Sequence, residues 1–148
     1  MRLPLFVSLL GYAGMVPFLL GPAWLQFSPG TAPAWLDPAW TNYVALLAAF
    51  LAGTFWGFAL PAIQGPAGVL GAFLAAGLML LAWATHLLPY PHELHALAAV
   101  FALLLLADFW RERTLDTLPG YFLLRTVLTG GAIAAIAWRL TLPPPSLL

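Results

Sequence analysis

Asp108 and Arg125 are charged residues inside long apolar stretches of the sequence, each about one helical turn from the loop between those stretches. Two kinds of chemistry fit this pair. A fixed ion pair would brace the two stretches against each other. Alternatively, a proton or anion site would use a carboxylate whose charge changes during transport. Charged groups within a membrane are costly to leave unpaired, which favours the intramembrane ion pair.

Three histidines surround one predicted loop, and they are the other group with ligand chemistry. His92 and His95 are three residues apart, so they could share a helix face, while His86 and Glu93 lie nearby. A zinc site needs three or four ligands, and the sequence contains no cysteine to complete one. We therefore predict no metal, no cofactor and no catalytic residue at this loop.

Thr54 and Trp56 are the remaining candidates for contact with a ligand, because they lie among small residues in an apolar stretch. A buried tryptophan needs an acceptor for its indole N–H. Ordinary packing in the core is the favoured interpretation. Contact with a lipid or another small molecule, such as a quinone headgroup, is the alternative.

The composition explains which elements position these residues. Apolar residues make up 63% of the 148 residues and charged residues 7%, against roughly 25% charged residues in a soluble domain. A span of about 30 Å of hydrocarbon takes roughly 20 apolar residues in a helix. The sequence predicts an all-α, polytopic membrane bundle in a single domain (1–148), with five spans at Leu3–Leu20, Tyr43–Leu60, Gly68–Leu88, Leu94–Trp110 and Tyr121–Leu140.

Proline and glycine mark the predicted loops between the spans. The first loop includes Gly21-Pro22, and it ends at Asp37-Pro38, which resembles an N-cap followed by proline in the first helical turn. Pro17 removes a backbone donor, so a bend is expected in the first span, which should face protein near residues 13–17. A cleaved signal peptide is the alternative for this span, but its apolar run is long for one.

The arginines predict an orientation. With the N-terminus in the cytoplasm and the C-terminus outside, one side of the membrane holds four of the five arginines and the other side holds only Arg139. This distribution follows the positive-inside rule. The net charge of zero offers no basic surface, so nucleic acid is not an expected partner.

Small residues recur every four positions along the second predicted span. This spacing lets the backbones of two transmembrane helices approach closely. The expected helix-packing residues are Ala45, Ala49, Gly53 and Gly57. Their partner is either another helix of the chain or a second copy.

Several short motifs follow one another along the chain in a distinctive order. They are Leu10-Gly11-Tyr12-Ala13-Gly14-Met15-Val16-Pro17-Phe18, Phe50-Leu51-Ala52-Gly53-Thr54-Phe55-Trp56-Gly57, Asp108, and Pro119-Gly120-Tyr121 followed by Leu124-Arg125-Thr126. Over residues 10–138 the sequence resembles a small bacterial and mitochondrial membrane family, domain of unknown function 3429 (transmembrane protein 69-like). The resemblance implies a five-helix inner-membrane protein and no known activity. The family pattern has a histidine before the Trp-Gly of the second span, where this chain has Phe55.

These features predict a multi-pass protein of the bacterial inner membrane that is not an enzyme. Its expected role is a scaffold or accessory component of a membrane assembly, with the lipid bilayer, a second copy or another membrane protein as its partner. The alternative is a small transporter or channel that functions as an oligomer, with Asp108 and Arg125 near the cytoplasmic side. A transporter usually contains repeated halves, and five helices cannot be divided equally.

Overall fold

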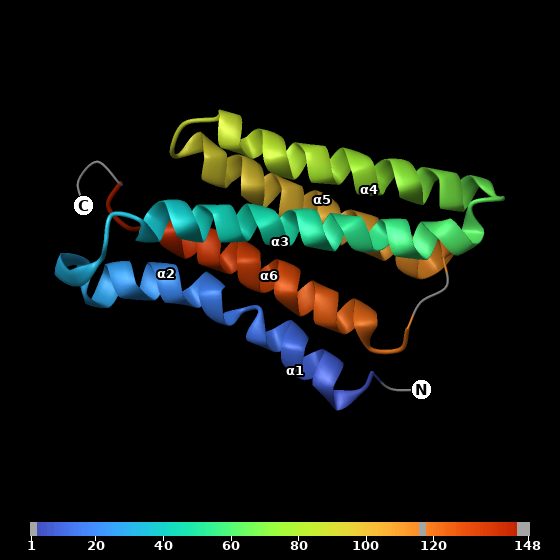
Figure 1. Cartoon of the computed structure of the whole chain (residues 1–148), viewed down its shortest axis with the longest axis horizontal. Coiled ribbons are helices and arrows are strands. Elements are labelled where there is room, and N and C mark those ends of the chain that lie inside the picture. Colours follow the sequence, from blue (N-terminus) through green and yellow to red (C-terminus); the bar gives the residue numbers. More distant parts are fainter. Residues whose placement is uncertain (1–2, 116–117, 145–148) are drawn as a thin grey trace.

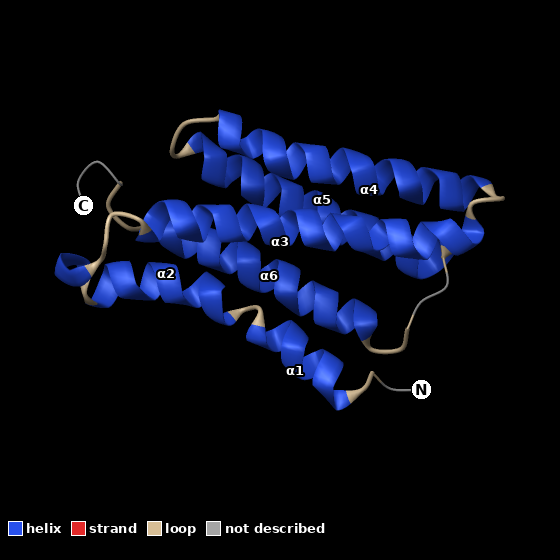
Figure 2. Cartoon of the chain, in the orientation of Figure 1, coloured by secondary structure: helices blue, strands red, loops and turns tan. Residues whose placement is uncertain are grey.

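The computed structural model describes residues 3–115 and 118–144, and within these ranges every secondary-structure element is a helix. The helices lie side by side along one long axis (Figures 1 and 2). They are α1 (Leu5–Ala13), α2 (Val16–Phe27), α3 (Leu36–Ala59), α4 (Pro66–Ala84), α5 (His92–Thr114) and α6 (Tyr121–Leu140), with 3₁₀ turns at Pro29–Thr31, Leu60–Ala62 and Thr85–Leu87.

In the described part of the chain, five helical spans are long and apolar enough to cross a membrane, so the predicted all-helical membrane bundle is confirmed. They cover Leu5–Phe27, Leu36–Ala62, Pro66–Leu87, His92–Thr114 and Tyr121–Leu140. Because the number of spans is odd, the first and last described residues lie at opposite ends of the bundle (Figure 1).

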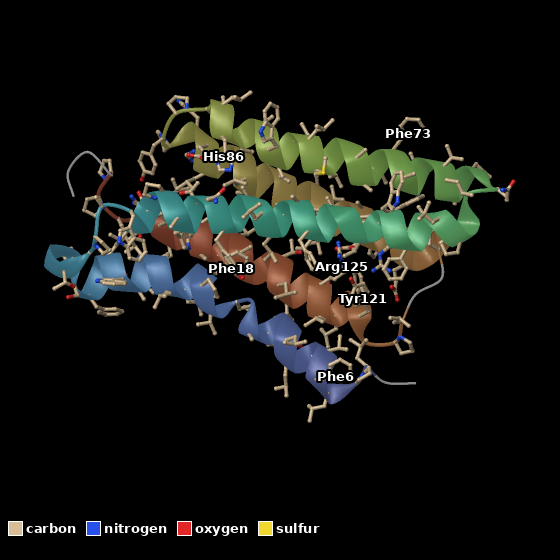
Figure 3. The ribbon with its side chains drawn as sticks, viewed as in Figure 1. Phe6, Phe18, Phe73, His86, Tyr121 and Arg125 are labelled. Carbon is tan, nitrogen blue, oxygen red and sulfur yellow. The ribbon has the colours of Figure 1, made fainter. Side chains whose placement is uncertain are left out.

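Apolar side chains cover the outside of the bundle as well as its core. Phe6 and Phe73 project outward with 63% and 73% of their surfaces exposed, whereas Phe18 is fully buried (Figure 3). Such an exterior suits hydrocarbon, and helices packed in it gain stability from close contact rather than from leaving water. The most extensive contact joins α3 to α4, and the next joins α5 to α6.

The first span is interrupted earlier than predicted. α1 ends at Ala13 and α2 begins at Val16, so the break precedes Pro17, which lies in the first turn of α2. At the break, the carbonyl of Gly14 accepts a 2.6 Å hydrogen bond from the hydroxyl of Tyr43. The first span therefore contacts protein at this point, as expected, and a side chain of α3 satisfies its interrupted backbone.

Gly21-Pro22 is not a loop, which corrects the sequence prediction. Both residues are buried inside α2, which continues to Phe27. Pro22 has no N–H to donate to the carbonyl of Phe18, four residues earlier. The indole N–H of Trp40 donates to that carbonyl instead, at 2.9 Å, so the helix continues through the proline.

The second span begins at Leu36 rather than at Tyr43, and Asp37 is not its N-cap. The structure places Trp35 at the cap position and Asp37 within the first turn of α3. The Asp37 carboxylate accepts hydrogen bonds from Arg139. It therefore does not accept from the free backbone amides of the first turn, as an N-cap carboxylate would. Polar residues such as Asn42 concealed this extension, because hydropathy alone marks where apolar sequence begins.

Candidate functional site

Asp108 and Arg125 form the ion pair that the sequence predicted. Arg125 Nε donates to Asp108 Oδ1 at 2.6 Å, and both side chains are buried. The remaining guanidinium nitrogens reach α3, where Nη2 donates to the carbonyl of Leu51 at 2.9 Å and Nη1 donates to the hydroxyl of Thr54. The pair therefore joins three helices, since it ties α3 to the α5–α6 hairpin.

Arg111 completes this group, which we call the Asp108 cluster: Thr54, Asp108, Arg111, Tyr121 and Arg125. Arg111 is fully buried, and its Nε lies 3.4 Å from the same Asp108 Oδ1. Its guanidinium lies over the rings of Phe58 and Tyr121, at 4.5 Å and 5.3 Å from their centroids. Aromatic faces partly replace the hydration that a buried guanidinium loses.

Positive charge exceeds negative charge at the centre of the Asp108 cluster, because two guanidinium groups share one carboxylate. The partly exposed Glu112 carboxylate approaches Arg111 Nη2 only to 3.9 Å. Among the described residues, Asp108 Oδ2 and Arg111 Nη1 and Nη2 have no hydrogen-bond partner. Three unsatisfied polar atoms in one buried cluster are the kind of groups that a bound water or another polar group satisfies.

A second polar group, the Arg139 cluster, lies at the other end of the bundle and consists of Asp37, Tyr90 and Arg139. Arg139 is fully buried and donates to both Asp37 oxygens, at 2.8 Å and 2.7 Å. This bidentate pair links the first turn of α3 to the last turn of α6. Tyr90 adds its hydroxyl, 3.4 Å from Arg139 Nη1, and its ring, whose centroid is 5.2 Å from the guanidinium.

The histidines lie beside the Arg139 cluster without converging. His86 Nδ1 is 2.8 Å from Glu93 Oε1, and both residues line a cavity of about 260 Å³ together with Asp37 and Tyr90. His95 Nδ1 is 3.0 Å from the carbonyl of Pro91 instead. Over residues 3–115 and 118–144, no three His, Asp or Glu residues are grouped as metal ligands.

Thr54 and Trp56, the two residues predicted as candidates for ligand contact, lie on different sides of α3. Thr54 turns inward to Arg125, whereas Trp56 is 50% exposed on the outer surface. The expectation that Trp56 packs in the core is therefore wrong. Positions two residues apart on a helix point in very different directions, and the neighbouring core position belongs to Phe55, which is fully buried.

The predicted packing ladder is divided in the same way. Ala45 is buried and Ala49 is half-buried, but Gly53 and Gly57 are exposed. A Cβ added to either glycine would meet nothing within 4 Å. The prediction is therefore wrong for the two glycines within this chain. The small residues of α3 that lie in the core are Ala45, which belongs to the predicted ladder, and Ala48, Ala52 and Ala59, which do not.

Sequence reasoning missed the role of Arg111 and the link between Asp37 and Arg139. Arg111 follows Asp108 by three positions, a spacing that already places the two side chains on one helix face. No comparable pattern connects Asp37 with Arg139, which are 102 positions apart. Only the antiparallel course of α3 and α6 brings them together.

Comparison with known proteins returns one family. A family model described as "Protein of unknown function (DUF3429)" matches residues 3–141. No curated protein matches the chain, and no solved structure does. The match covers every helix described above, from α1 to α6. The chain therefore belongs to the DUF3429 family of proteins of unknown function.

Proposed function

We propose that this protein is a non-enzymatic component of a bacterial inner membrane that serves as a scaffold or accessory subunit of a membrane assembly. The observation that carries the proposal is the outward-facing Gly53–Gly57 step of α3. It is an association motif that no helix of the described chain occupies.

The surface around this step has the properties of a helix-docking face. Gly53 and Gly57 are four residues apart, and open space lies beside both. A GxxxG step allows close approach of a second transmembrane backbone. Trp56 adjoins the step, and its indole N–H donates to none of the described residues. A partner that supplies an acceptor would satisfy this N–H.

The interior of the bundle supports a packing role. Apolar side chains from five helices, α2 to α6, fill its centre, among them Phe18, Phe55, Leu97, Phe101 and Ile136. The buried charges lie near the two ends, in the Asp108 and Arg139 clusters. An arrangement with charges confined to the ends stabilises a bundle without providing a polar route along its axis.

Purification in mild detergent tests the proposal with paired variants. Leucine at position 57 would fill the step, so Gly57→Leu should lose a partner that the unaltered chain retains. Gly130→Leu is the matched control, because Gly130 is also exposed in open space but lies on α6. We expect one stoichiometric partner, either another membrane protein or a second copy, to be retained by the control.

Two results would contradict the proposal. Retention of the partner by Gly57→Leu would show that the step is not the docking face. A homodimer enclosing a polar cavity would favour the second candidate, a small transporter or channel. The observation behind that candidate is the set of unsatisfied buried atoms on Asp108 and Arg111. In an oligomer, these polar atoms could line part of a path for a solute across the membrane.

A further inference from the structure

A groove of about 530 Å³ runs between α4 and α5 on the outside of the bundle. Its volume falls in the range of small-molecule sites. Gly77 helps to open it, since a Cβ at this position would meet nothing within 4 Å. The wall is almost wholly apolar and includes Phe73, Gly77 and Leu81 from α4 and Leu103, Leu106 and Trp110 from α5.

Both walls belong to spans that are long and apolar enough to cross a membrane, Pro66–Leu87 and His92–Thr114. The groove therefore opens to hydrocarbon rather than to water. A lipid acyl chain is a flexible apolar rod that can follow a groove between two helices. The binding free energy of such a chain comes from van der Waals contact with the groove wall, because moving it out of bulk lipid provides no hydrophobic driving force.

Positive charge lies near one end of the groove. Trp110 closes the α5 wall, and Arg113 follows within one turn. The Arg113 side chain is exposed, its guanidinium is 4.1 Å from the ring centroid of Phe109, and it forms no ion pair with a described residue. Tryptophan and arginine at the end of a span are the side chains that meet lipid headgroups, and arginine binds phosphate by charge-assisted hydrogen bonds.

We propose that the α4–α5 groove binds one acyl chain of an anionic phospholipid, and that Arg113 contacts the phosphate of its headgroup. The apolar groove and the exposed guanidinium of Arg113, which lies over Phe109 within one turn of the groove's last α5 residue, together match the two parts of such a lipid. This site is separate from the Gly53–Gly57 face on α3, so it extends the proposed function without depending on it.

Native mass spectrometry of the full chain, released from detergent, measures the bound lipid directly. Phosphatidylglycerol and phosphatidylcholine with the same acyl chains are added separately. We expect phosphatidylglycerol to bind the unaltered chain more tightly. Arg113→Gln should weaken phosphatidylglycerol binding by about fivefold, the effect of removing one arginine near a charged lipid surface. It should weaken phosphatidylcholine binding less, because the choline cation offsets the charge of that lipid's phosphate.

Gly77→Leu tests the groove itself, because the leucine side chain would occupy the space of the acyl chain. It should abolish the bound-lipid peak for both lipids, while Gly130→Leu should retain it. Replacing glycine by leucine within a helix favours the helical state, and circular dichroism verifies that each variant is folded. Arg113→Gln provides a second test that does not alter the groove.

Three outcomes would overturn the proposal. Unchanged lipid binding by Gly77→Leu would exclude the groove as the site. Equal binding of the two lipids by the unaltered chain would exclude an anionic headgroup. Loss of a dimer peak rather than a lipid peak in Gly77→Leu would show that a second copy of the chain occupies the groove.

Discussion

Asp108 is the residue on which the buried charges of its cluster depend, because one of its oxygens lies within 3.4 Å of the guanidinium groups of both Arg111 and Arg125. Burying such a group costs desolvation energy that the ion pairs offset. Removing the carboxylate would leave two guanidinium groups buried in an apolar environment. Removing one arginine would leave the other still paired with Asp108.

This asymmetry predicts different costs for the two partners. Asp108→Asn should lower the free energy of unfolding by about 3–5 kcal/mol, the usual cost of an uncompensated buried charge. Arg125→Gln should cost less, since Arg111 remains beside the carboxylate. Denaturant titration in detergent, followed by circular dichroism, measures both values.

The double variant decides whether the pair is a local brace. If Asp108 and Arg125 stabilise each other, the double variant should lose less stability than the sum of the single variants. Glu112→Gln is the control, because the Glu112 carboxylate is exposed and comes no closer to Arg111 than 3.9 Å, so its effect should stay below about 1 kcal/mol. Strictly additive losses would mean that the pair is not a brace.

At the scale of elements, Trp40 and Pro22 illustrate how one helix repairs the backbone of another. Pro22 leaves the carbonyl of Phe18 without its helical donor, and the Trp40 indole supplies one across the α2–α3 contact. Gly21 allows this approach, because a Cβ there would come within 2.7 Å of Trp40 Cγ.

A double-mutant cycle tests this compensation. Trp40→Phe removes the donor and should cost about 1–3 kcal/mol, because a buried carbonyl is left unsatisfied. Pro22→Ala restores an N–H at position 22, so Trp40→Phe should cost less in that background. Denaturant titrations of the four proteins give the coupling energy. An identical cost in both backgrounds would show that the indole hydrogen bond does not compensate for the proline.

At the scale of the whole molecule, the two polar clusters distinguish the ends of the bundle. Arg111, Arg113 and Arg125 belong to one end and Arg139 to the other, while Arg2 lies outside the described residues. Arginines near short loops favour the cytoplasmic side. The end with the Asp108 cluster is therefore predicted to be cytoplasmic, with the N-terminus on the same side.

Single-cysteine labelling tests this orientation, because the native chain contains no cysteine. Gly30 and Gln64 are exposed and lie in connections at opposite ends of the bundle. In intact inner-membrane vesicles of native orientation, Gly30→Cys should react with a membrane-impermeant maleimide from the outer side. Gln64→Cys should react only after the membrane is permeabilised. The reverse pattern would place the N-terminus outside.

Composition and apolar run length determined much of this protein by themselves. Hydrocarbon thickness fixes the length of a span, so the helical class, the number of spans and the bounds Tyr121–Leu140 followed from the sequence. The Asp108–Arg125 pair also followed, because two opposite charges near one short loop have few other partners in lipid.

Only the tertiary structure decided which face of each helix is buried and which distant residues meet. The glycine ladder on α3 had the spacing of a packing face, yet α4 packs against a neighbouring face and leaves Gly53 and Gly57 open. Apolar periodicity could not distinguish these faces, because both core and lipid accept apolar side chains. The Asp37–Arg139 and Trp40–Phe18 contacts were likewise decided by antiparallel packing, which brings together residues that no local pattern connects.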